Sequence, residues 1–180
     1  LPNSWRSKLD NDVNVLGVVN NETPTTTIRL SMDVGQRDEP LEKLGLAAIT
    51  ASMMNEATLK SSNEDLSNRL QKLGSAVTFG ANNNTTTLAI RSLSENLDAT
   101  LAIAAEKLLQ PKFDADDFKR VQAQTLQAIE SSKTDAGATV ASVYQQLIFG
   151  KDNPFAYLNM GTVETVSEIT LDDVKAFHAA

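Results

Sequence analysis

The sequence lacks cysteine altogether and contains a single histidine, His178. Without cysteine, the chain can form neither a disulfide nor a thiolate metal site. With only one imidazole, it cannot by itself build a zinc site from two histidines and a glutamate. We predict that His178 is a surface residue at a fraying helix end. These absences exclude disulfides, thiolate metal sites and a zinc site of two histidines and one glutamate within this chain.

Long apolar runs and positive charge are also scarce. No run approaches the ~20 apolar residues that a membrane-spanning helix needs, and no signal-peptide pattern opens the chain. The 16 Lys and Arg are outnumbered by 23 Asp and Glu, which gives a net charge of −7. Because nucleic-acid binding depends on clustered cations, we expect no nucleic-acid partner. Because the apolar runs are short, we expect no membrane segment in this chain.

The residues that are present are typical of a folded protein. Hydrophobic residues make up 41% of the 180 residues, which is enough for a single domain with its own core over residues 1–180. The chain opens with Leu1 and Pro2 instead of methionine. We therefore interpret it as a fragment or processed product of a larger multi-domain protein.

Apolar periodicity predicts strands and helices in a mixed order. The pattern indicates strands near 13–19, 28–34, 76–81 and 85–92, and helices near 41–59, 62–73, 94–110, 118–129, 140–149 and 170–177. There is no β-α-β alternation, phosphate-binding glycine loop or internal repeat. This order favours an α+β fold, with an antiparallel or mixed sheet covered on one side by helices.

Acidic residues gather at two predicted helix starts. Asp114, Asp116 and Asp117 precede one helix, and Asp172 and Asp173 precede another. Carboxylates at these positions cap free backbone N–H groups and offset the helix dipole. We favour this capping role over the alternative of a divalent-ion site.

The segment Gly45–Thr58, GLAAITASMMNEAT, resembles the motif helix of M16 metallopeptidases, the insulinase and mitochondrial processing peptidase family. In that G-L-A-H-x-x-E-H-M motif, two histidines one helical turn apart bind zinc and the glutamate activates water. The histidine positions correspond to Ala48 and Ser52, and the glutamate position corresponds to Ala51. We expect these three residues simply to pack the helix against the sheet.

Other segments resemble the family in the same order along the chain. In active members, a glutamate further along completes the zinc site, and the matching position here is Ala128. Glu130 is two residues away, about 200° around a helix, and would point elsewhere. The further landmarks are Leu9–Leu16, Val34–Pro40, Ser62–Gly74, Leu93–Leu97, Pro111–Phe113, Asp117–Arg120, Asn153–Phe155, Gly161–Thr162 and Ile169–His178.

The resemblance implies a LuxS/MPP-like metallohydrolase-type unit that lacks its last strand. It implies no catalytic residue and no metal in this chain, with zinc instead in a homologous catalytic half, in cis or in trans. The two halves would clasp a chamber for a shared peptide substrate, and the parent protein would be a zinc metalloendopeptidase. The alternative is a structural scaffold like the core-protein subunits of the respiratory bc1 complex. A periplasmic or exported bacterial location is expected, with a mitochondrial location as the alternative.

One strand is a candidate for peptide contact. In active members, the strand that matches 76–81 is a sheet edge that pairs with extended substrate. Those members carry Asn-Ala where this chain has Val77 and Thr78, although backbone pairing does not depend on side chains. Val77, Thr78 and Phe79 are therefore candidate substrate-binding residues, and the alternative is a plain edge strand.

Overall fold

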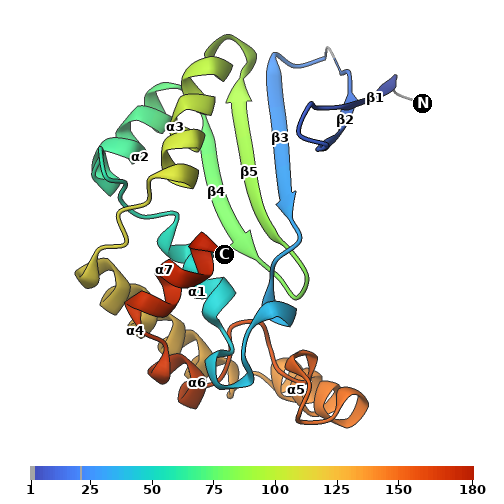
Figure 1. The fold of residues 1–180 in the computed structure, drawn as a ribbon, viewed down its shortest axis with the longest axis vertical. Coiled ribbons are helices and arrows are strands. Elements are labelled where there is room, and N and C mark those ends of the chain that lie inside the picture. The colour runs from blue at the N-terminus through green and yellow to red at the C-terminus, as the bar shows by residue number, and fades with distance from the viewer. Residues whose placement is uncertain (1–2, 21) are drawn as a thin grey trace.

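The computed structural model describes residues 3–20 and 22–180 (Figure 1). Leu1 and Pro2, on which the fragment interpretation depends, lie outside the described residues. The strands are β1 (Ser4–Lys8), β2 (Asn14–Val18), β3 (Thr25–Met32), β4 (Ala76–Ala81) and β5 (Thr86–Leu93). The helices are α1 (Leu46–Met53), α2 (Asn63–Lys72), α3 (Leu97–Leu109), α4 (Ala115–Ser132), α5 (Ala136–Phe149), α6 (Val163–Glu168) and α7 (Leu171–Ala179).

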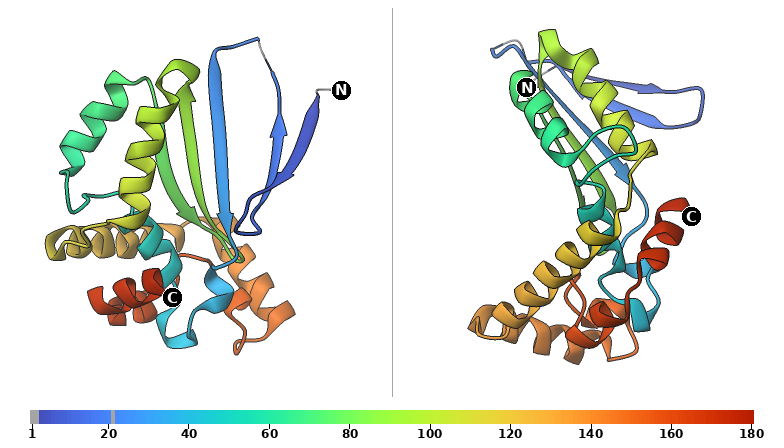
Figure 2. Two further views of the ribbon diagram at one scale, coloured as in Figure 1. Left: turned by 45° about the horizontal axis from the view of Figure 1, so that its top comes forward. Right: turned by 90° about the vertical axis from the view of Figure 1, so that its left-hand side faces the viewer.

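The main sheet is antiparallel, with the strand order β3-β5-β4. Ile28 of β3 lies opposite Ile90 of β5, and Leu88 of β5 lies opposite Phe79 of β4. Along each strand, side chains on one face are buried or partly buried, while the other face carries exposed residues such as Arg29. Helices α4 to α7 gather at one end of the sheet (Figure 2). The predicted α+β class, with a sheet covered on one side, is confirmed.

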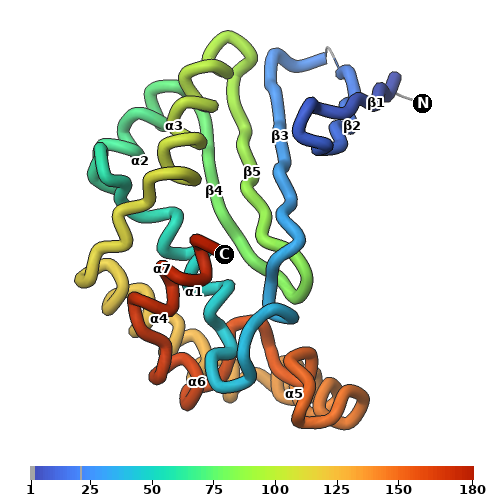
Figure 3. The backbone as a smooth tube through the Cα atoms, in the orientation of Figure 1, coloured from blue at the N-terminus to red at the C-terminus, as the bar shows by residue number. Residues whose placement is uncertain are grey.

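A separate hairpin stands beside the sheet. Strand β2 fits the predicted strand near 13–19, but its partner β1 was not predicted. All five β1 residues, Ser4–Lys8, are exposed, so their sequence shows no apolar alternation that could reveal a strand. Figure 3 shows the hairpin lying on the β3 side of the sheet, away from β4.

Helix α1 is shorter than predicted. The expected helix over 41–59 is in fact a short 3-10 turn (Leu41–Lys43) followed by α1. Gly45 separates them because its backbone adopts the left-handed region at φ +100°, which a continuous helix does not allow. Helix α6 was not predicted because its six residues are too few to show an apolar period.

The N-terminus of α1 is packed against the 160–161 loop by a close backbone approach. A Cβ atom added to Gly161 would lie 2.1 Å from the Leu44 carbonyl oxygen, and one added to Gly45 would lie 2.7 Å from the Met160 carbonyl oxygen. Gly161 also has a positive φ of +79°. Only glycine fits at this crossing, so the crossing fixes the start of α1 relative to the loop that leads into α6.

Helix α5 is oriented opposite to the usual amphipathic arrangement. Its apolar stripe forms a helix as predicted, yet Val140 is 69% exposed and Leu147 is 80% exposed. The partly buried residues of α5 are small or polar, for example Ser142 and Gln146. Within α5, none of the described side chains is buried. The apolar stripe thus faces away from the core; we call it the α5 apolar face, and its members are Val140, Val143, Tyr144, Leu147 and Ile148.

Candidate functional site

Three of the predicted motif positions meet in one depression. Ala48 and Ser52 lie one turn apart on α1, and Ala128 lies on α4. All three line the same hollow, with a volume of about 520 Å³. Ser52 and Ala128 are exposed and Ala48 is half-buried. The fold therefore brings together residues from two distant segments of the chain.

Ala51 faces the interior instead. Its side chain is 2% exposed and belongs to the core of the domain. It also lines a cavity of about 100 Å³ beside Phe177 and His178. Packing of the helix by Ala51 agrees with the prediction, but the same expectation for Ser52 is wrong. The Ser52 hydroxyl is exposed and donates to the Ala48 carbonyl oxygen at 2.9 Å.

The rest of the depression is lined mainly by amides and hydroxyls. Asn55, Gln124, Thr125 and Asn159 contribute to it together with one carboxylate, Glu56. Both Arg120 and Asn63 donate to Glu56, each at 2.7 Å. Over residues 3–20 and 22–180, the structure contains no group of three or more His, Cys, Asp or Glu that could hold a metal ion. The depression can therefore offer hydrogen bonds to a ligand.

Two further residues considered in the sequence analysis, Glu130 and His178, lie outside this depression. Glu130 is exposed and pairs with Lys133 at 2.7 Å. The prediction that His178 is a free surface residue is wrong. Its ring packs edge-on against the Phe113 ring, with 5.2 Å between the ring centroids. Its Nε2 atom also lies 3.0 Å from the Leu108 carbonyl oxygen. The last turn of α7 is therefore docked against α3 and its following loop.

One carboxylate of each acidic cluster forms a cap, as predicted, and the other carboxylates pair with Lys or Arg on the same helix. The Asp114 side chain accepts from the Asp116 amide at the start of α4. At the start of α7, Thr170 and Asp173 form a reciprocal capping box. Hydrogen bonds from the Thr170 hydroxyl and amide lower the pKa of Asp173, and Lys43 contributes further to this effect. These contacts give the carboxylates a structural role.

Glu39 provides the cap for α1. Its carboxylate accepts from the Gly45 amide at 2.9 Å and from the Ala47 amide at 2.6 Å. Burial raises the pKa of Glu39 to about 7, and the two backbone hydrogen bonds oppose that rise only in part. Glu39 is thus a buried acid that supports the helix carrying Ala48 and Ser52.

Glu39 should make stability depend on pH. Because its folded pKa lies above the ordinary value, the folded state holds the proton more tightly than the unfolded chain. The stabilisation is complete below about pH 4.5 and is lost as the pH rises through about 7. Between pH 5 and 8, the free energy of unfolding should fall by up to about 2.5 kcal/mol relative to Glu39→Gln. Urea unfolding of both proteins at each pH measures this, and a constant difference would contradict it.

Among the described residues, strand β4 is the outer strand of the sheet, and one of its residues is bonded on its outer side. Val77 and Phe79 are buried against the core, and Thr78 is exposed on the opposite face of the sheet. The Phe79 amide donates to the Asn55 Oδ1 atom at 2.8 Å, and Asn55 Nδ2 donates to the Phe79 carbonyl oxygen at 2.9 Å. No pattern in the sequence indicates this contact, since a single asparagine after a helix is common.

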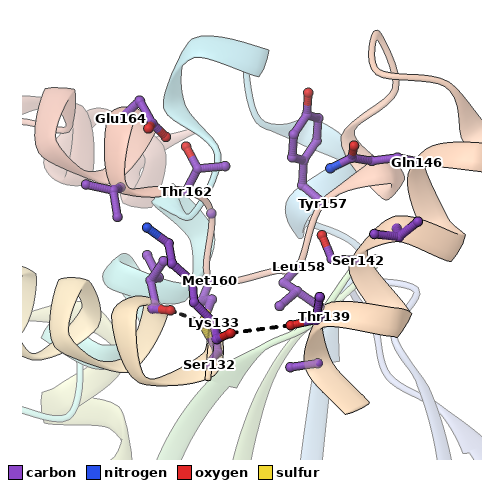
Figure 4. Close-up of a pocket in the computed structure, with 15 residues that line it drawn as sticks. Ser132, Lys133, Thr139, Ser142, Gln146, Tyr157, Leu158, Met160, Thr162 and Glu164 are labelled. Carbon is purple, nitrogen blue, oxygen red and sulfur yellow. Dashed lines mark hydrogen bonds between the residues drawn. The ribbon is translucent and has the colours of Figure 1, made fainter. Parts of the chain in front are cut away.

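The structure contains a second hollow that no pattern in the sequence predicts. It has a volume of about 370 Å³ and lies between the C-terminal end of α4, the inner face of α5 and the 157–164 segment (Figure 4). Lys133 and Glu164 are its charged residues, and the Lys133 carbonyl oxygen accepts from the Thr139 hydroxyl at 3.4 Å. The rest of its lining is apolar or hydroxylic apart from Gln146, and it shares Met160 with the first depression.

Comparison with known proteins identifies the family. The family model described as Insulinase (Peptidase family M16) matches residues 15–148. The chain belongs to the M16 peptidase family. A solved M16 structure, described as the inactive domain of a peptidase from Pseudomonas fluorescens, aligns with a TM-score of 0.90 and 27% identity. The alignment covers 98% of this chain and 43% of that chain.

Two curated M16 relatives differ in their described activity. The non-peptidase homolog YmxG of Helicobacter pylori is 24% identical over 87% of this chain and 36% of its own length. An uncharacterised zinc protease of Streptomyces coelicolor is 23% identical over 86% of this chain and 33% of its own length. The chain therefore spans about a third of these relatives.

No helix in the described part of the structure is long and apolar enough to cross a membrane.

Proposed function

We propose that this chain is a non-catalytic domain of an M16-type zinc peptidase, which docks with a homologous catalytic half and forms one wall of a peptide-binding chamber. In this proposal the catalytic half, in cis or in trans, holds the zinc and cleaves the peptide. The parent protein is a zinc metalloendopeptidase. Alone, this chain neither retains zinc stoichiometrically nor cleaves peptides.

The observation that carries the proposal is the convergence of Ala48, Ser52 and Ala128 in one depression. By resemblance, these are the three positions that would hold zinc in an active member. Methyl groups and one hydroxyl cannot replace imidazole and carboxylate as ligands, because zinc in proteins is bound by nitrogen, thiolate or carboxylate groups. Ala51 at the position of the catalytic glutamate also cannot activate water.

The α5 apolar face supports docking to a second half. Five large apolar side chains that face solvent on one helix exceed what single scattered surface residues explain. Contact surfaces between protein domains are commonly rich in such residues, tyrosine included. The relatives are more than twice as long as this chain, and so have further protein that could cover the face. We propose the homologous half as its occupant.

Docking can be tested with an M16 half that carries an intact H-x-x-E-H motif, taken from the flanking coding region. We expect a one-to-one complex by size-exclusion chromatography with light scattering, and peptide cleavage only when both halves are present. The double variant Val140→Asp/Leu147→Asp should weaken the complex at least about tenfold, because it places charge in the apolar contact.

The matched control is Ser67→Asp/Asn68→Asp, which adds the same charge to exposed positions on α2. It should leave the complex unchanged. Failure of the unmodified chain to bind the catalytic half would contradict the proposed function. Equal binding by the α5 variant and the control would instead assign docking to another surface.

The second candidate is a scaffold subunit of a non-peptidase M16 assembly, like the bc1 core proteins. The match to a non-peptidase homolog favours it. The discriminating observation is the coding region around this chain: an intact motif half nearby supports the chamber, and its absence supports the scaffold. For location we propose the periplasm or another exported bacterial site, with the mitochondrion as the alternative, which fractionation of the source cells would test.

A further inference from the structure

The outer edge of β4 has the geometry that normally admits a further strand. It is the terminal strand of the β3-β5-β4 sheet among the described residues. In an antiparallel strand, alternate residues direct both the N–H and the C=O group away from the paired neighbour. Phe79 is one of these outward residues, because both of its backbone groups are bonded to Asn55 and not to β5. An incoming peptide strand would need these same two groups.

We propose that the Asn55 side chain substitutes for one residue of a neighbouring strand and closes the β4 edge to added peptide. A primary amide has one acceptor and two donors. Asn55 uses the acceptor and a donor on the two outward groups of Phe79, the same exchange that a paired residue makes in an antiparallel ladder. This inference depends on the geometry of this chain alone and stands apart from the proposed docking.

Asn55 is held in place from several directions. Its Nδ2 atom also donates to the Ala51 carbonyl oxygen at 3.1 Å, and its own amide donates to the Ser52 carbonyl oxygen at 3.0 Å. The Nζ atom of Lys107 donates to the Asn55 carbonyl oxygen at 3.0 Å. Lys107 is only 4% exposed, so this contact provides its buried amine with a hydrogen-bond acceptor. A peptide would have to displace a side chain with little freedom to move.

The closure continues along the strand. Asn159 Nδ2 donates to the carbonyl oxygen of Ala81, the next outward residue of β4, at 3.1 Å. Asn55 and Asn159 both line the depression that holds Ala48, Ser52 and Ala128. The two amides thus lie between that depression and the strand edge. The predicted peptide contact by Val77, Thr78 and Phe79 is therefore replaced, in this inference, by an edge that is filled from within.

The test uses a short fluorescein-labelled peptide of repeating Thr-Val-Thr-Lys as the probe for strand addition. We compare the unmodified chain with Asn55→Ala, which removes the bonds and vacates the space, and with Asn55→Leu, which removes the bonds but keeps a side chain of similar size. Fluorescence anisotropy measures peptide binding. Hydrogen exchange by NMR measures protection of the Phe79 amide.

Exchange of the Phe79 amide should accelerate about tenfold or more in both variants, because its hydrogen bond is lost. Peptide binding should strengthen at least about tenfold in Asn55→Ala only, since Leu still obstructs the edge. Equal peptide affinity in the unmodified chain and Asn55→Ala would overturn the proposal. Faster exchange without any gain in binding would also overturn it, because the edge would then be open and yet not used.

Discussion

Zinc should bind tightly to the triple variant Ala48→His/Ser52→His/Ala128→Glu, and the purified variant should retain roughly one equivalent after dialysis. The unmodified chain should retain less than about a tenth of an equivalent, because a lone imidazole does not hold zinc. The variant supplies two histidines one turn apart on α1 and a carboxylate across the depression on α4. All three side chains start from exposed or half-buried positions, so the fold can accommodate them.

The matched control is the double variant Ala48→His/Ser52→His, which lacks the carboxylate at position 128 and keeps Glu130 on α4. The Glu130 carboxylate is exposed and paired with Lys133, so the double variant should bind zinc at least about tenfold more weakly. Elemental analysis and competition with a chelator measure both proteins. Equal affinity of the triple and double variants would show that Ala128 is not the third position.

Ala51→Glu is deliberately absent from this set of variants. Ala51 is part of the core, and burying a carboxylate there without partners would cost several kcal/mol. Restored metal binding should also not restore catalysis, because the triple variant leaves Ala51 at the position of the glutamate that activates water. The triple variant thus tests whether positions 48, 52 and 128 correspond to the zinc ligands of active members. It is not designed to restore peptide cleavage.

Replacing Gly161 by alanine should destabilise the domain by more than about 3 kcal/mol, enough to lower Tm by roughly 10 °C. The added Cβ would lie 2.1 Å from the Leu44 carbonyl oxygen, and that oxygen belongs to the backbone and cannot rotate away. The positive φ of Gly161 adds strain for any other residue. Relief would require the 160–161 loop to separate from the start of α1.

Gly80→Ala provides the control, because a Cβ at Gly80 has nothing within 4 Å. That substitution should shift Tm by less than about 2 °C. Thermal unfolding followed by circular dichroism compares the two variants under the same buffer. Similar Tm values for Gly161→Ala and Gly80→Ala would contradict the close approach between the two loops.

Much of the element order was accessible from the sequence because β3, β4, β5, α2 and α4 each carry a clear apolar period. The start of α1 was not, since it lies at Gly45, whose backbone is left-handed and packs closely against Met160, more than a hundred residues away. Helix α5 shows a related limit. Its period predicted a helix correctly, but periodicity alone does not reveal which side of a stripe is covered.

The candidate site, like the fold, was predictable from the sequence only in part. The i, i+4 spacing places Ala48 and Ser52 on one side of a helix, whereas Ala128 could be matched to them only through the family resemblance. Several sequence landmarks prove to be contact points. Gln36 donates to the Pro154 and Tyr157 carbonyl oxygens, which joins the Val34–Pro40 and Asn153–Phe155 landmarks. The pairing of Asn55 with Phe79 depends on tertiary packing, and no local pattern indicates it.

The outward orientation of α5 also has a consequence for synthesis inside a cell. With nothing covering α5, the domain displays a tyrosine and four aliphatic side chains along one helix. Chaperones and proteases recognise such surfaces, so an unpaired copy would be retained or degraded. If a homologous half on a separate chain covers this helix, the abundance of the domain would follow the supply of that half. The amounts of the two halves would then be matched after translation, by degradation of copies whose α5 apolar face is uncovered.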